Sequence, residues 1–483
     1  MSGNLKKKSV KGIAWSFVES ASTKVIQFVI GIIMARLLMP ADYGIVAIIL
    51  VFITISQVFI DGGFATTLIQ DKNKTERDYS TVFTFNVLIS VFFYILLYIT
   101  APFISKFYST DITIYLRVQS LGIIIYSLSS IHKIRMMVAV NFKAIAKVTV
   151  ISSLLSGGIG VLLAYKGFGV WALIWQYITS AVMVTCMYTV TQRWKPVCFF
   201  DIKSFRRLFP FGMRLMAASI IDKIYTNLYP IIIGKYCNQI QLGLYSRAEQ
   251  FTSMPAFTCV DVFARVTFPI MSSITDENQL ISVYRKYISL SSFIIMPLLF
   301  ALLALTKPLV LILLTEKWAG IIVLMQILCC GFLLEHISSI NRNMVYVKGR
   351  ADLALKLEII KKTTAFLILV VSIPFGLIGL CIGKAIYGLL AMLLNSIYTK
   401  RLIGISILEQ VKDFTPYLFM GVLSTLTALI PVYCLNNLYA ELLFGGVTFA
   451  SFYIGLAFIT HNESLKEVYA IMKERIFQNK KLV

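Results

Sequence analysis

Charged residues are scarce in this chain. Only 14% of its 483 residues are charged and 58% are hydrophobic, whereas a soluble domain has about 25% charged residues. This little charge cannot coat the roughly three soluble domains that a chain of this length would otherwise form. The apolar residues gather in stretches of about 20, the length that crosses ~30 Å of hydrocarbon. The composition therefore predicts a polytopic membrane protein.

Motifs for metals and nucleotides are also missing. The chain has 3 histidines and 8 cysteines, and the cysteines are mostly isolated within apolar segments, with Cys329 and Cys330 as the one adjacent pair. No cysteine and histidine groups occur at zinc spacing. The sequence KGFG at residues 166–169 lacks the pattern of a phosphate-binding glycine loop. We therefore predict neither a metal nor another cofactor.

Acidic residues are half as common as basic ones, which leaves a net charge of +22 from 45 Lys and Arg against 23 Asp and Glu. A nucleic-acid surface would show a basic stripe interleaved with aromatic residues. Here the basic residues form small clusters between the apolar runs, so a nucleic-acid partner is not predicted. The clusters recur in alternate connecting segments, which by the positive-inside rule places both termini in the cytoplasm.

The apolar runs predict an all-α protein with about fourteen transmembrane helices. Helices are required because lipid-facing backbone groups need hydrogen-bond partners within their own segment. The predicted spans are 13–36, 44–68, 79–101, 112–131, 147–166, 170–191, 211–234, 245–270, 287–306, 319–340, 355–374, 377–399, 415–435 and 438–460.

An internal repeat predicts two lobes. When span 1 is aligned with span 7, Lys24 falls on Lys223 and Gly44 on Gly243. Six spans per repeat insert the same way up, so the lobes would be related by an axis along the membrane normal, with a central cleft between them. The predicted parts are an N-lobe (1–200), a C-lobe (201–402), two extra C-terminal helices (403–461) and a cytoplasmic tail (462–483).

Four segments resemble a known family of transporters. They are ARLLMPADYG at residues 35–44, QVFIDGGF at 57–64, LGLYSRA at 242–248 and FPIMS at 268–272. They are similar to segments of the Wzx-type oligosaccharide repeat-unit flippases, in the colanic-acid and teichuronic-acid exporter branch. These flippases belong to the multidrug/oligosaccharidyl-lipid/polysaccharide (MOP) exporter superfamily. Relatives often have glycine before the proline of the first segment, where this chain has Met39.

The resemblance implies a flippase of lipopolysaccharide or exopolysaccharide biosynthesis in the bacterial cytoplasmic (inner) membrane. Such a protein moves undecaprenyl-pyrophosphate-linked oligosaccharide repeat units between the leaflets by alternating access. The expected partners are this lipid-linked substrate, the membrane lipids, and the polysaccharide polymerase and export machinery. No catalytic activity is expected.

Ionisable residues inside the spans are the candidates for transport, because each costs about 2.5–3.5 kcal/mol to insert. They concentrate in spans 1, 2, 7 and 8. A pyrophosphate needs cationic donors when it leaves water, so the basic members predict a cationic cavity formed by Lys24, Lys223, Arg214 and Arg265. The acidic members are candidates for gating or ion coupling, and they are Glu19, Asp61, Asp222 and Asp261.

Several of these residues also have purely structural interpretations. Arg214 lies in the first turns of its span, where its long side chain can reach the headgroups. Asp261 and Arg265 are four residues apart, which favours a mutual ion pair. Asp61 precedes two glycines near the inner end of its span, which predicts either a gate or helix break, or a plain helix-ending turn.

Two other functions compete with the flippase. A membrane glycosyltransferase or polymerase would need a long extramembrane loop or a cluster of acid and base residues, and no connecting segment is long enough. A cation-coupled multidrug exporter of the same superfamily fold is the main alternative. Such an exporter needs few buried cations, whereas basic residues are at least as prominent as acidic ones in the candidate cavity. Glu19, Asp61 and Asp222 still leave ion coupling open.

Overall fold

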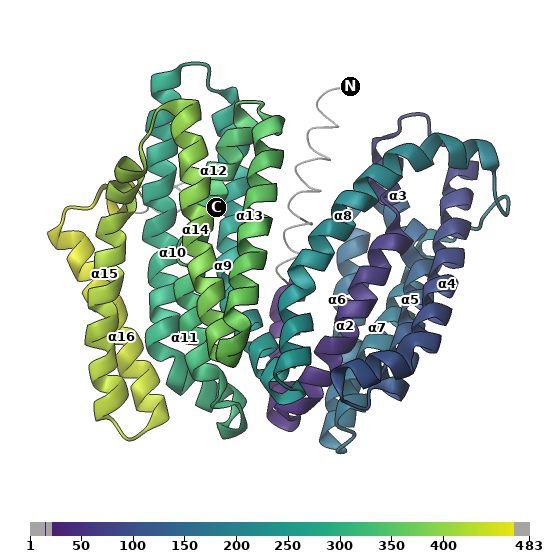
Figure 1. Cartoon of the computed structure of the whole chain (residues 1–483), viewed down its shortest axis with the longest axis horizontal. Coiled ribbons are helices and arrows are strands. Elements are labelled where there is room, and N and C mark those ends of the chain that lie inside the picture. Colours follow the sequence, from purple (N-terminus) through teal and green to yellow (C-terminus); the bar gives the residue numbers. More distant parts are fainter. Residues whose placement is uncertain (1–14, 16–21, 468–483) are drawn as a thin grey trace, which may run out of the picture. The chain divides into compact units, whose positions relative to one another are not determined.

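The computed structural model describes Trp15 and residues 22–467, and within them all regular structure is helical (Figure 1). The start of the first predicted span, including Glu19, and most of the predicted C-terminal tail lie outside the described residues. The predicted all-α architecture is confirmed for the part that the structure describes.

Every predicted span has a helical counterpart, the first of them from residue 22 onward. The first half of the chain contains a helix over residues 22–37, α2 (Pro40–Asp61), α3 (Phe64–Gln70), α4 (Glu76–Tyr108), α5 (Thr113–Val138), α6 (Phe142–Tyr165), α7 (Val170–Gln192) and α8 (Ile202–Tyr236). The second contains α9 (Gln239–Ser273), α10 (Glu277–Leu314), η1 (Glu316–Trp318), α11 (Ile321–Phe332), α12 (Glu335–Val347), α13 (Ala351–Ser372), η2 (Ile373–Phe375), α14 (Gly376–Ile403), α15 (Ile407–Cys434) and α16 (Leu438–Ile459).

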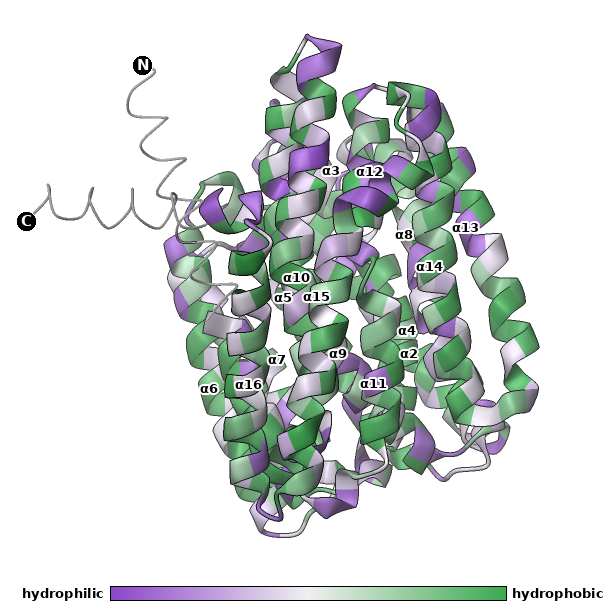
Figure 2. Ribbon diagram, turned by 90° about the vertical axis from the view of Figure 1, so that its left-hand side faces the viewer, coloured by the Kyte–Doolittle hydropathy of each residue, from purple (hydrophilic) through white to green (hydrophobic). Residues whose placement is uncertain are grey.

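Among the described residues, 11 helical segments are long and apolar enough to cross a membrane. One of them, Asp352–Ile403, joins α13 and α14. α8 falls short because it carries Arg214, Asp222 and Lys223 along its length. Hydrophobic residues cover most of the helix lengths (Figure 2). The chain is therefore a multi-pass membrane protein, and the side of the membrane on which each terminus lies stays a prediction.

Local sequence signals set where the helices begin and bend. α4 starts with a capping box, in which the Asp78 carboxylate accepts a 2.7 Å hydrogen bond from the backbone N–H of Thr75. α15 starts in the same way at Ser406 and Glu409. Prolines lie inside several long helices, including α4, α8 and α10, where each removes a backbone hydrogen bond and favours a bend.

The chain divides into two compact units, residues 1–243 and 244–483, and the boundary falls within α9. In the first unit α4 packs on α5, α6 and α5 pack on α7, and α2 packs on α8. In the second, α10 and α16 pack on α15, while α14 contacts α11, α12 and α13.

α8 belongs to the first unit, although residue 201 was the predicted start of the second lobe. Its Leu208 lies in one buried cluster with Phe64, Leu68 and Ile131 of α3 and α5. An apolar face on this helix therefore joins it to the first six spans. Packing and an internal repeat are different properties, so the predicted repeat of six spans stays a prediction.

Candidate functional site

Asp61 ends α2 at a break in the second span. Gly62 and Gly63 both adopt left-handed backbone conformations, with φ of 53° and 70°, and the helix resumes as α3 at Phe64. Glycine takes this conformation at no steric cost. Of the two predicted alternatives, the structure has the helix break, with Asp61 exposed at it. A role of Asp61 in gating stays a prediction.

The break rests directly on α8. A Cβ atom on Gly63 would lie 2.4 Å from the backbone oxygen of Gly212, and one on Gly212 would lie 2.8 Å from that of Gly62. Only residues without side chains fit on both sides of this contact. Arg214 follows Gly212 by two residues, so the structure brings the turns that carry Asp61 and Arg214 together in the first unit.

The side of α8 that faces away from the rest of the first unit carries exposed charged residues. Arg214, Asp222 and Lys223 are all exposed, whereas Leu208 and Gly212 are buried against the rest of the first unit. Charged side chains inside a membrane almost always face the protein interior or water rather than lipid. We therefore expect this face of α8 to meet water or an anionic ligand.

Lys24 is half-buried in the helix over residues 22–37. This helix packs closely on α6, because a Cβ atom on Gly157 would lie 2.0 Å from the Cδ1 atom of Ile30. Lys24 and Lys223 therefore lie in the same compact unit, although the predicted repeat assigned one to each lobe. Glu19, the carboxylate predicted to border Lys24, is outside the described residues.

Asp261 and Arg265 lie on α9, in the second unit. Both are exposed, and the ion pairs of the described residues do not include one between them. The predicted mutual ion pair is therefore not found in the structure, and both side chains remain candidates for contact with water or a ligand.

The structure adds a cation that the sequence analysis overlooked. Lys384 on α14 forms an ion pair with Glu249 on α9, and its ammonium also donates a 2.7 Å hydrogen bond to the hydroxyl of Tyr245. It lies 5.3 Å from the centre of the Tyr245 ring and 5.9 Å from that of Phe332. The side chains of Lys384 and Glu249 are 19% and 31% exposed, so this pair is open to a ligand.

Glycine contacts fix the backbone that carries Lys384. A Cβ atom on Gly388 of α14 would lie 2.3 Å from the backbone oxygen of Gly331 on α11. The two helices therefore cross in direct backbone contact, one turn from the lysine. A sequence signal for this site exists, because Lys384 is the one charged residue between Gly376 and Thr399 and carries the same insertion cost as the other candidates.

Another lysine of the second unit is a contrasting case. Lys361 on α13 has a side chain only 5% exposed and lies 2.5 Å from the Glu358 carboxylate on the same helix. The Glu358 side chain is 39% exposed, but a partner three residues away on the same helix is typical of a structural ion pair. The two lysines therefore differ in exposure, 5% for Lys361 against 19% for Lys384, and in partner, which lies on the same helix for Lys361 and on another helix for Lys384.

An ion pair and hydrogen bonds hold the linker between α7 and α8, and the start of α8, against α4. Arg207 of α8 lies 2.5 Å from the fully buried carboxylate of Asp78, and Trp194 of the linker donates a 2.8 Å hydrogen bond to Glu76. Asp201 caps α8, and hydrogen bonds from the Ser204 hydroxyl and backbone N–H hold the pKa of this carboxyl below its usual range. These contacts position the start of α8.

Apolar helices of membrane-spanning length define a multi-pass membrane protein, and the accessible basic side chains within them mark a candidate site for an anionic ligand. Residues 33–323 match the family of polysaccharide biosynthesis proteins. The chain belongs to this family, and the resemblance predicted from its sequence is confirmed.

Two relatives and one solved structure illustrate the similarity. The chain is 25% identical to the teichuronic acid biosynthesis protein TuaB of Bacillus subtilis (strain 168), over 73% of this chain and 74% of TuaB. It is 23% identical to the lipopolysaccharide biosynthesis protein WzxC of Escherichia coli (strain K12), over 82% of this chain and 80% of WzxC. Its fold is similar to that of the lipid II flippase MurJ in an inward closed conformation, with a TM-score of 0.76 and 15% identity over 93% of this chain and 100% of MurJ.

Proposed function

We propose that this protein is a flippase of polysaccharide biosynthesis in the bacterial inner membrane. It moves undecaprenyl-pyrophosphate-linked oligosaccharide repeat units from the cytoplasmic to the outer leaflet by alternating access. The biosynthetic names of TuaB and WzxC and the flippase fold of MurJ support this class of substrate. Transport of a lipid-linked sugar requires no bond to be made or broken, and no catalytic group is assigned.

The observation that carries the proposal is the open ion pair between Lys384 and Glu249. A pyrophosphate oxygen can replace the Glu249 carboxylate at the Lys384 ammonium, because both are anionic oxygen acceptors. The Tyr245 hydroxyl is already held at the same ammonium and is a second donor for the incoming phosphate. We assign this cluster of the second unit to recognition of the pyrophosphate. The exposed Arg214 and Lys223 of α8 are separate candidates, within the first unit, for contact with the anionic substrate.

Deletion of the gene in its native host tests the function. We expect the cells to lose one surface polysaccharide and to accumulate lipid-linked repeat units that remain inaccessible to enzymes added outside the cell. Re-expression of the wild-type gene should restore the polymer. Loss of resistance to cationic drugs with an unchanged surface polysaccharide would instead indicate the multidrug exporter.

A further inference from the structure

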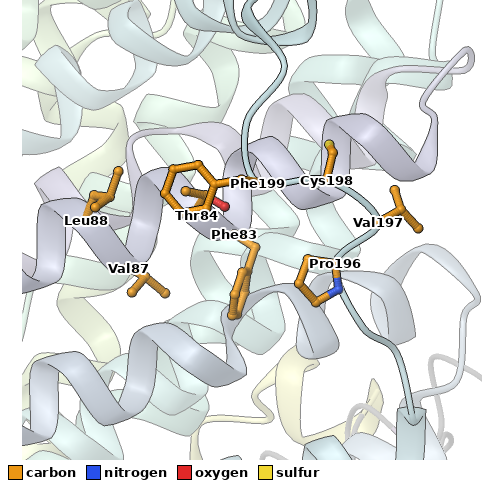
Figure 3. Close-up of a pocket in the computed structure, with 8 residues that line it drawn as sticks. All are labelled: Phe83, Thr84, Val87, Leu88, Pro196, Val197, Cys198 and Phe199. Atoms are coloured by element: carbon orange, nitrogen blue, oxygen red, sulfur yellow. The ribbon is translucent and has the colours of Figure 1, made fainter.

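An apolar groove lies on the first unit where the linker between α7 and α8 passes over α4 (Figure 3). α4 contributes Phe83, Thr84, Val87 and Leu88, and the linker contributes residues 196–199. The groove has a volume of about 380 Å³. None of its lining residues is charged, and the proposed transport does not use it.

The groove and its rim expose large hydrophobic side chains. Phe199 is 76% exposed, Val197 62% and Leu88 52%. A contiguous apolar surface of this kind marks a contact with another protein or with lipid. Since α4 is one of the membrane-spanning helices, hydrocarbon chains are the expected surroundings of Leu88.

Specific hydrogen bonds hold the linker in place over α4. The backbone N–H of Val197 donates to the Ser80 hydroxyl (2.9 Å), and that of Asp201 donates to the Thr81 hydroxyl (3.1 Å). Beside the groove, the rings of Trp194 and Phe83 pack with their centres 5.7 Å apart. The groove is thus formed by fixed contacts at both ends of the linker.

Exposed basic residues lie on the two segments that form the groove and at the start of α8. Arg77, Lys195 and Lys203 are all exposed, and Arg77 acts electrostatically on Asp201 at the end of the linker. Arg77 and Leu88 are separated by about 16 Å along α4, at 1.5 Å per residue. This is about the depth of one leaflet of a ~30 Å hydrocarbon core. With Arg77 at the headgroups, Leu88 of the groove lies in the acyl-chain region.

We propose that the groove binds one acyl chain of an anionic phospholipid of the cytoplasmic leaflet, with the lipid phosphate held by Lys195 and the neighbouring Arg77 and Lys203. An acyl chain matches the apolar walls, and an anionic headgroup matches the basic rim. A zwitterionic lipid offers the same chain, but its headgroup also carries a cation that this rim repels. The bound lipid would join the linker to α4 and so support the start of α8.

Trp194 serves as a built-in reporter for the test, because it lies against a groove wall. Purified full-length protein in detergent is titrated with phosphatidylglycerol brominated on its acyl chains, and in parallel with brominated phosphatidylcholine. Bromine quenches nearby tryptophans, and subtraction of the signal of the Trp194→Phe variant isolates the contribution of Trp194. We expect phosphatidylglycerol to quench Trp194 at a concentration at least about fivefold lower than phosphatidylcholine, since one basic residue near an anionic lipid contributes about 1 kcal/mol and the rim has three.

A charge reversal at the rim provides the matched comparison. Lys195→Glu should weaken quenching by phosphatidylglycerol about five- to tenfold, whereas Lys147→Glu, an exposed lysine at the start of α6, should leave it unchanged. Equal quenching by the two lipids, or an equal effect of the two substitutions, would overturn the proposal. Loss of quenching when undecaprenyl phosphate is added at a lower concentration than the phospholipid would assign the groove to the substrate tail instead.

Discussion

Lys384 on α14 is paired with Glu249 on α9, and the pair is partly exposed within the second unit. If this lysine binds the substrate pyrophosphate, Lys384→Gln should lower glycan export about tenfold or more. The loss corresponds to one charge-assisted hydrogen bond, about 1.5–3 kcal/mol. Export is measured as surface polysaccharide per amount of flippase in the membrane, and the amount of flippase should stay near that of the wild type.

Two further substitutions separate binding from folding at this site. Lys384→Arg should keep part of the activity, because the positive charge and its donors remain. Lys361→Gln, at the buried lysine that pairs with Glu358 on its own helix, should lower the amount of protein rather than its specific activity. If Lys384→Gln instead lowers abundance, and Glu249→Gln added to it restores the level, Lys384 has a structural role only.

Lys24 and Lys223 are the cations predicted from the sequence, and both lie in the first unit. Neutralising either one to Gln should reduce export without reducing abundance, and the double variant should be the most impaired. The reason is that each intramembrane lysine costs roughly 3 kcal/mol to insert. A lysine that costs this much is expected where its charge binds the substrate. Normal export by the double variant at normal abundance would remove both residues from the cationic site.

The contact between the break in the second span and α8 predicts a stability effect. Gly63→Ala should lower the free energy of unfolding in detergent by about 2 kcal/mol or more. The alanine would be strained at a positive φ, and its Cβ atom would lie only 2.4 Å from the backbone oxygen of Gly212. The change is measured as a melting temperature, with thermal unfolding monitored by size-exclusion chromatography. Gly158→Ala in α6 is the control, because open space surrounds that position, and its melting temperature should be unchanged or slightly higher. Equal melting temperatures for the two variants would contradict the close contact.

The orientation in the membrane is predicted from the basic clusters. Single cysteines near Lys166, Gln239 and Asn437, in a chain without its native cysteines, should react with impermeant reagents added outside the cell. Single cysteines near Lys74, Lys203 and Arg350 should react only after the cells are opened. Labelling of a cysteine near Lys203 from outside would invert the second half and overturn the predicted orientation.

Hydrophobic length predicted the helices well, because each span must satisfy its own backbone hydrogen bonds in lipid. The break at Gly62 and Gly63 was also visible in the sequence as one of two alternatives. Packing was less predictable. The membership of α8 in the first unit depends on a glycine contact with residues nearly 150 positions away along the chain (Gly63 and Gly212), and no local pattern reports it.

The candidate site was likewise predictable only in part from the sequence. The sequence identified charged residues within spans but could not tell how far each side chain is buried or which partner it has, as Lys384 and Lys361 illustrate. The spacing of Asp261 and Arg265 favoured an ion pair that the structure lacks. Spacing along one helix reports only which side chains can meet, whereas the partners of Lys384 come from another helix.

Flipping in a purified system tests the proposed function most directly. The protein is reconstituted into vesicles that contain a fluorescent undecaprenyl-pyrophosphate oligosaccharide, and a membrane-impermeant glycosidase is added outside. In vesicles with the wild-type protein we expect nearly all of the labelled sugar to be cleaved, because flipping continually returns substrate to the outer leaflet. In vesicles with the Lys384→Gln variant we expect cleavage of the second half of the sugar to be about tenfold slower than with the wild type. Cleavage that stops at one half with correctly folded wild-type protein would contradict the assignment as a flippase of this substrate.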